Sequence, residues 1–110
     1  MVGADLRGAN LKNAKLNNSD LRDANLGPLI ITADRLLPAQ LQGATIRYSD
    51  LRGADLLRAN FMGADLAYSN LIGTKLRLTD FSESNLDTTL FSKGALRDAT
   101  AAGCKGLPEA

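Results

Sequence analysis

The chain has 110 residues, the size of one domain, and its 13 basic and 12 acidic residues leave a net charge of +1. A charge this small provides no bulk attraction to nucleic acid or to anionic lipid. Histidine is absent and Cys104 is the one cysteine, which excludes the commonest general base, an intrachain disulfide and a thiolate metal cluster. We therefore expect no metal site, no cofactor and no catalytic residues.

The N-terminal sequence MVGADLRGAN lacks the charged and apolar segments of a signal peptide. No apolar run approaches the length of a membrane span. We expect a cytoplasmic protein that does not bind membranes, and export of a longer precursor is the alternative.

An apolar residue recurs at every fifth position, nineteen times in succession from Leu6 to Leu96. The residue two positions earlier is Ala, Ser, Thr or Gly in seventeen of these units, the exceptions being Leu29 and Asp34. Neither a helix nor a strand has this period. Two inward side chains two residues apart fit a short extended piece, after which the chain must turn so that the next pair points inward from the next side. Four such sides close a square coil of twenty residues, and coils stack at about 4.8 Å.

The central residues of the later units should fill the axis of this coil. Residues twenty apart should stack, so we expect Phe61 against Phe81 in the core and Tyr48 against Tyr68 on the surface. Asp or Asn precedes most central residues, and such side chains bond nearby backbone groups in turns. The predicted core consists of Leu51, Leu56, Phe61, Leu66, Leu71, Leu76, Phe81, Leu86 and Phe91.

The repeat units resemble those of the pentapeptide-repeat family. The units ADLRG at 4–8, ANLKN at 9–13, ADLLR at 54–58 and ANFMG at 59–63 carry this resemblance. It implies an all-β fold, a right-handed quadrilateral β-helix with about five coils of four pentads. On this basis we expect a solenoid over residues 1–98 and a C-terminal tail or cap over residues 99–110.

Residues 27–38, GPLIITADRLLP, interrupt the pattern, although Ile31 and Leu36 keep its phase. Leu29 is too large for a small position, and Asp34 would place a charge in the dry core. The sequence therefore favours an excursion that leaves the wall after Gly27 and Pro28.

We expect this loop excursion to cover residues 29–38 and to rejoin the wall at Ala39. Thr32 is a candidate cap for a short helical turn over residues 33–37. The alternative is two atypical pentads that stay in the wall.

The pattern also loosens beyond Leu86, because Leu90 stands where Asp or Asn is usual. The last stretch, ATAAGCKGLPEA, has no central Leu, although the end of a solenoid exposes an edge that needs covering. We expect an irregular tail there, and a short helix from a Ser92 cap to Gly103 is the alternative.

Carboxylates are plentiful, but their places in the repeat predict turn and wall hydrogen bonds and no acid–base pair. They are Asp5, Asp20, Asp50, Asp55, Asp65 and Asp80. Without histidine there is no Ser–His or Cys–His arrangement, and Cys104 is expected to be an incidental thiol.

Outward positions are the remaining candidates for binding. Leu57 and Leu78 should lie on one face, with Ile72 and Met62 on others, and a contiguous apolar patch would mark an interface. Arg47 beside the two stacked tyrosines is a second candidate. The possible interaction residues are Tyr48, Leu57, Arg58, Met62, Tyr68, Ile72 and Leu78, with Asp34 and Arg35 in the interruption.

The pattern is typical of a non-enzymatic structural or protein-interaction scaffold, whose partner would be another protein and not a nucleic acid. The bare start of the repeats at Ala4 suggests either end-to-end self-association or a missing upstream segment. The alternative is a DNA-mimicking protein that protects DNA gyrase, as one branch of the family does. That branch consists of acidic rods, whereas this chain carries a net charge of +1.

Overall fold

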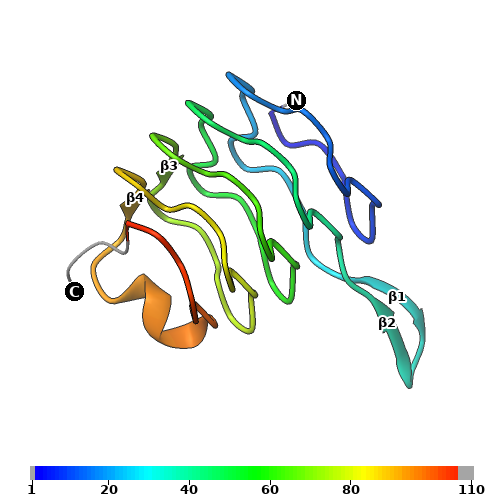
Figure 1. The fold of residues 1–110 in the computed structure, drawn as a ribbon. Coiled ribbons are helices and arrows are strands. Elements are labelled where there is room, and N and C mark those ends of the chain that lie inside the picture. Colours follow the sequence, from blue (N-terminus) through cyan, green and yellow to red (C-terminus); the bar gives the residue numbers. More distant parts are fainter. Residues whose placement is uncertain (1, 107–110) are drawn as a thin grey trace.

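The structure is a computed structural model that describes residues 2–106, apart from the side chain of Asp98. Figure 1 shows flat coils stacked along one axis, a hairpin that projects from one side, and a short helix near the C-terminal end. The hairpin pairs β1 (Leu29–Thr32) with β2 (Arg35–Leu37) in antiparallel fashion. The coils contain the parallel pair β3 (Asn70–Leu71) and β4 (Leu90–Phe91), and the helix is the 3-10 turn η1 (Ala95–Asp98).

Parallel bridges join residues twenty apart, or thirty apart across the hairpin, at four positions in each coil, so the coil has four walls. Wall A contains Asp5, Asn25, Asp55 and Lys75. Wall B contains Asn10, Gln40, Asn60, Asp80 and Thr100. Wall C contains Lys15, Thr45, Asp65, Asn85 and Lys105. Wall D contains Asp20, Asp50, Asn70 and Leu90.

Each wall position makes the same pair of backbone bonds to its neighbours. The Asp80 amide donates to Ala59 O at 3.0 Å, and the Phe61 amide donates to Asp80 O at 2.7 Å. In a stack of such units every inner coil therefore pairs its backbone on both sides, as buried peptide groups require.

The corners explain the five-residue period. An Asx side chain accepts the amide two residues ahead, as Asp80 Oδ1 does from Ser82 N at 2.8 Å. The second corner residue then takes the left-handed conformation, with φ of 57° at Tyr48 and 70° at Gly63. The expected role of Asp and Asn in turns is thus confirmed.

The axis is filled by the residues that the period points inward. Phe61 and Phe81 are fully buried and stack with ring centroids 5.3 Å apart. Phe91 is half-buried at the end of the core and meets Phe81 edge-on at 6.0 Å. The other predicted core residues, Leu51, Leu56, Leu66, Leu71, Leu76 and Leu86, are all buried.

The interruption is an excursion, as the sequence favours. Asn10 bridges Gln40 and Asn25 bridges Asp55, thirty residues apart, so ten extra residues lie outside the ladder. Ala39 is fully buried where the chain rejoins the wall. Ile31 and Leu36 are 51% and 44% exposed, so their agreement with the five-residue phase is a coincidence.

The excursion is a β-hairpin, and the helical turn expected over residues 33–37 is wrong. Leu29 pairs with Leu37 and Thr32 with Arg35 around a two-residue turn. The apolar, β-branched run LIIT favours an extended strand, and RLL supplies a partner of matching length. The two strands thus satisfy their own backbone groups away from the coil.

The C-terminal segment also differs from the expectation. The chain leaves wall A through η1, but it returns, and Thr100 bridges Asp80 while Lys105 bridges Asn85. The wall therefore continues past the boundary expected at residue 98. Residues 107–110 of the expected tail lie outside the described residues. The alternative of one helix from Ser92 to Gly103 is wrong, because only Ala95–Asp98 is helical.

Candidate interaction surfaces

The predicted outward residues are distributed over all four corners of the rod. Leu57, Arg58 and Leu78 lie at the corner between walls A and B, from which the hairpin also projects. Tyr48 and Tyr68 lie half a coil away, at the opposite corner between walls C and D. Met62 and Ile72 lie at the two remaining corners, so they join neither group.

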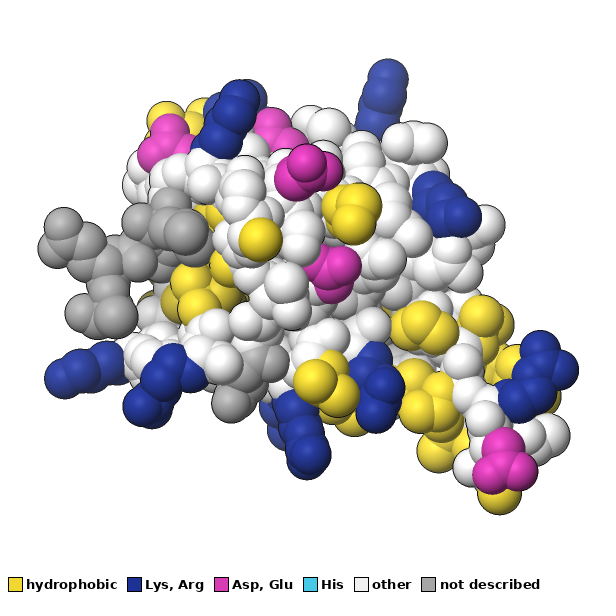
Figure 2. All heavy atoms as spheres, turned by 60° about the horizontal axis from the view of Figure 1, so that its bottom comes forward, with side chains coloured by type: hydrophobic (Ala, Val, Ile, Leu, Met, Phe, Trp, Pro, Cys, Tyr) yellow, Lys and Arg dark blue, Asp and Glu magenta, His cyan; other side chains and the backbone are white. Residues whose placement is uncertain are grey.

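The hairpin carries the largest group of exposed apolar side chains among the described residues. We name Leu29, Ile30, Ile31 and Leu36, which are 38%, 69%, 51% and 44% exposed, the hairpin surface. Figure 2 shows apolar side chains gathered on the projecting hairpin, with charged side chains at its end. Asp34 and Arg35, at the turn and the start of β2, are exposed.

The base of the hairpin lies against the first coil. A Cβ placed on Gly8 would come within 2.8 Å of Leu29 Cβ and 3.1 Å of Leu37 O. A side chain at this position would therefore collide with the hairpin, so Gly8 lets the hairpin base pack closely on the corner.

The opposite corner presents two stacked tyrosines. The Tyr48 and Tyr68 rings lie 5.0 Å apart and within 6° of parallel, as predicted from their spacing of twenty. The Arg47 guanidinium lies 5.8 Å and 5.7 Å from the two ring centroids. Its Nε is also 3.8 Å from an Asp65 carboxylate oxygen. The cation already has two rings and a carboxylate beside it, although the buried Arg47 Nε has no hydrogen-bond partner among the described residues.

The corner between walls D and A carries a row of exposed Asp–Arg pairs. Arg22 Nη2 is 2.7 Å from Asp20, and Arg52 Nη2 is 2.7 Å from Asp50. The hydrogen bond from Arg22 lowers the pKa of Asp20 to about 2 from its ordinary value of 3.8. Arg52 lowers the pKa of Asp50 in the same way. These charges are neutralised in place, which suits a structural role.

No arrangement suited to catalysis occurs among the described residues. The wall carboxylates serve the turns, as when Asp55 Oδ1 accepts the Leu57 amide at 3.0 Å. Within residues 2–106, no three acidic, histidine or cysteine side chains come together to hold a metal ion. The same residues contain no helix with the length and apolar character needed to span a membrane. Cys104 Sγ donates to Phe81 O at 2.7 Å, so the thiol packs on the end of the core.

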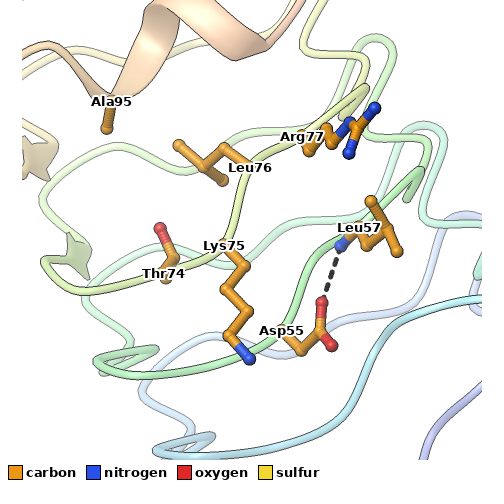
Figure 3. Close-up of a pocket in the computed structure, with 7 residues that line it drawn as sticks. All are labelled: Asp55, Leu57, Thr74, Lys75, Leu76, Arg77 and Ala95. Carbon is orange, nitrogen blue, oxygen red and sulfur yellow. Dashed lines mark hydrogen bonds between the residues drawn. The ribbon is translucent and has the colours of Figure 1, made fainter.

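Sequence reasoning missed one feature, an opening in wall A beside η1. A hollow of about 490 Å³ occurs there. It is lined by Asp55, Leu57, Thr74, Lys75, Leu76, Arg77 and Ala95 (Figure 3). The available signal was the change from Asn70 to Leu90 on wall D, which removes the side-chain acceptor for the following corner.

Comparison with solved structures finds several similar chains. One is HetL, a protein involved in heterocyst differentiation regulation from the cyanobacterium Nostoc sp. strain PCC 7120, at 26% identity and a TM-score of 0.48. That match covers 96% of this chain and 52% of HetL. Full-length QnrB1, a plasmid-mediated fluoroquinolone resistance protein, matches at 17% identity and a TM-score of 0.49, over 94% of this chain and 58% of that one.

Rfr23 from the cyanobacterium Cyanothece 51142 matches at 16% identity and a TM-score of 0.38, over 92% of this chain and 86% of its own. The chain thus spans about half to three fifths of the length of the first two structures. No curated protein matches it.

The part of the chain that matches a protein family is the part that forms the coils. The family described as pentapeptide repeats matches residues 1–27, 39–77 and 59–98 with eight copies. The matched ranges omit residues 28–38, the segment that forms the hairpin. The repeat pattern, the parallel ladder and this match together show that the chain belongs to the pentapeptide-repeat family.

Proposed function

We propose that this chain is a non-enzymatic protein-interaction scaffold in which the rod holds the hairpin surface out to a protein partner. One observation carries the proposal: four large apolar side chains are exposed on a hairpin that the coil does not use. The ladder closes beside the hairpin, since Asn25 bridges Asp55 across the insertion. Exposed apolar residues grouped in this way are typical of an interface.

The surroundings of the hairpin support a protein partner in particular. Arg35 and Asp34 would form a polar rim beside the apolar centre, which is the usual arrangement at protein interfaces. Leu78, 51% exposed, extends the apolar character along the same corner of the rod. The axis of the described coils is filled by buried apolar side chains, and this supports a role without catalysis.

The proposal includes the finer features of the rod. We take the coil to be right-handed, as the family resemblance implies. Five successive positions on wall B, from Asn10 to Thr100, support a count of about five coils. No observation favours the alternative of gyrase protection by DNA mimicry, because a mimic needs an acidic surface and the net charge is +1.

The test is to remove the hairpin without disturbing the coil. Replacing residues 27–38 with Arg-Gly leaves a two-residue corner between Leu26 and Ala39. A simple deletion of residues 29–38 would place Pro28 at the second corner position, where φ is 57° at Tyr48 and 70° at Gly63. Proline holds φ near about −65°, so that deletion would distort the turn.

Affinity capture from the source cells, read by quantitative mass spectrometry, should then lose the partner. The double variant Ile30→Asp, Ile31→Asp should lose it too, whereas Tyr48→Ala with Tyr68→Ala at the opposite corner should retain it. A partner that stays bound to the Arg-Gly variant would overturn the proposal. Sedimentation at several concentrations identifies the case in which the hairpin surface pairs with a second copy.

A further inference from the structure

Wall A ends one coil earlier than the other three walls. Walls D, B and C continue to Leu90, Thr100 and Lys105, each paired with the residue twenty positions before it. On wall A the next position is residue 95, which belongs to η1 and makes no bridge to Lys75. The last described turn of the chain, from Leu90 to Lys105, therefore has three walls and a gap at residue 95.

The gap leaves backbone groups without partners. In the coil before, the Leu56 amide donates to Lys75 O at 3.0 Å, and Ala54 O accepts the Lys75 amide at 3.1 Å. The equivalent groups one coil later are the Leu76 amide and Thr74 O, and within residues 2–106 neither has a hydrogen-bond partner. Unpaired groups of this kind form an edge to which another strand can be added.

The sequence before η1 explains why the chain leaves the wall. At the same corner of earlier coils, Asp50 and Asn70 accept the amide two residues ahead. Leu90 has no side-chain acceptor for Ser92, and Gly94 then turns the chain with φ of 73°. Leu96, half-buried, packs on the end of the core, so η1 covers the axis and leaves the wall position beside Lys75 open.

We infer that this gap, the wall A slot, binds an extended acidic segment of a partner protein as an added parallel strand. The backbone sets the geometry: one residue of the segment would donate its amide to Thr74 O and accept from Leu76 N. Lys75 makes the same two bonds to Ala54 O and Leu56 N in the preceding coil. Every bridge in the ladder is parallel, so the added strand would run in the same direction.

Charge sets the chemistry of the segment. Lys75 and Arg77 are exposed on the lining of the slot, and no carboxylate lies within 4.0 Å of either among the side chains that the structure describes, a set that does not include Asp98. Asp55, on the far side of Lys75, already accepts the Leu57 amide (Figure 3). An Asp or Glu beside Lys75 would extend the line of wall A positions and pair with the lysine. A small residue before it and an apolar residue after it would match the pentapeptide unit.

The hairpin surface is not needed for this site, which is tested without any natural partner. The probe is the peptide Met-Gly-Ala-Asp-Leu-Ala-Tyr-Ser, residues 62–69 of this chain, added to the full-length ¹⁵N-labelled protein. Before addition, the Leu76 amide should exchange with solvent much faster than the paired Leu56 amide. Titration should shift the Leu76 signal and slow its exchange.

Backbone methylation of the peptide tests the strand geometry. N-methylation of its Asp removes the donor to Thr74 O and should weaken binding by about tenfold or more. N-methylation of its Leu is the matched control, because the Leu66 amide at this position in the wall points to the following coil. This control peptide should bind within about twofold of the parent peptide.

Substitution of the protein tests the charge. Lys75→Glu should weaken binding by about fivefold, and a peptide with Lys in place of Asp should bind that variant better than it binds the parent protein. Lys15→Glu, an exposed change on wall C, is the control and should have no effect.

Three results would overturn the inference. The first is a Leu76 amide that is already protected in the free protein. The second is binding that is insensitive to methylation at Asp, as for a ligand held by side chains alone. The third is a peptide that shifts other amides, or none, at millimolar concentration.

Discussion

The chain leaves its ladder in two places, and the two departures have opposite effects. The hairpin adds ten residues at a corner, and the walls on either side of it close, with Asn25 bridged to Asp55 and Gln40 to Asn60. The segment around η1 adds none, since Leu90 and Thr100 keep the spacing of twenty, yet it leaves the Leu76 amide without a partner.

The difference shows what the coil tolerates. An insertion at a corner changes only the path between two walls, and the hairpin satisfies its own backbone groups through antiparallel pairing. A change within a wall removes one rung from a ladder whose groups depend on the neighbouring coil. The number of inserted residues is therefore a poor guide to how far the ladder is disrupted in this fold. The position of the change within the pentad is a better guide.

The regular coil between the two departures sets the scale of stability, and it gives the largest expected effect. Phe61→Ala should lower the free energy of unfolding by about 3–5 kcal/mol, because it opens a cavity in the Phe61–Phe81 stack. Chemical denaturation measures this loss.

A matched pair of leucines tests whether burial or phase decides the effect. Leu66→Ala, at a fully buried wall position, should cost about 2–5 kcal/mol. Leu36→Ala has the same phase but is 44% exposed on the hairpin, and it should cost less than about 1 kcal/mol. Equal losses at the two positions would contradict the comparison between wall and hairpin.

The third prediction concerns the corner before η1. Leu90→Asn would supply the acceptor that Asn70 provides to Ile72, and Leu90 is 52% exposed, so little apolar burial is lost. We expect a gain of about 0.5–1 kcal/mol in the free energy of unfolding. Leu90→Ala is the control, because it removes the leucine without adding an acceptor. A gain shared by both variants would show that the acceptor is irrelevant.

A smaller effect is expected at the same corner of the first coils, and it depends on pH. The folded-state pKa of Asp20 is lowered to about 2 by the hydrogen bond from Arg22, and that of Asp50 is lowered by Arg52. The pKa of Asp5, at the corner between walls A and B, is lowered by Arg7 in the same way. A lowered folded pKa means that the stabilisation is present above the ordinary value of 3.8 and is lost as pH falls toward 2.

Urea denaturation at several pH values between 7 and 2 checks this dependence. Asp20→Asn should flatten the fall in stability in that window, and Arg22→Gln should flatten it similarly because it removes the same pair. Unchanged slopes in both variants would show that the pair is too well solvated to matter.

Much of this architecture follows from the sequence because the five-residue period is strict. The spacing of twenty alone places Phe61 against Phe81 and Tyr48 against Tyr68. The excursion is also predictable, because Leu29 and Asp34 cannot occupy small inward positions. These inferences depend on size and charge at fixed positions, which the sequence states directly.

The conformations of the hairpin and of the segment around η1 were harder to predict, because alternative local structures compete there. Ile31 and Leu36 keep the phase by coincidence, so period alone could not show that they leave the core. Residues 33–37 could satisfy their backbone either in a helical turn or in a strand pair, and only a matching partner strand decides. The wall A slot was equally hidden, because Leu96 keeps its apolar identity while its segment changes from wall to helix.

The smallest expected effect is on the hairpin itself. Replacing residues 27–38 with Arg-Gly should change the free energy of unfolding by about 1 kcal/mol or less in either direction. The variant loses the packing between Leu29 and Gly8, which destabilises it. It also needs less entropy to close a two-residue corner, which stabilises it. Because the ladder closes beside the hairpin, the variant should keep the parallel bridges that define the coil. A large loss of stability would mean that the hairpin supports the first coil, and its exposed apolar residues would then need no partner to explain them.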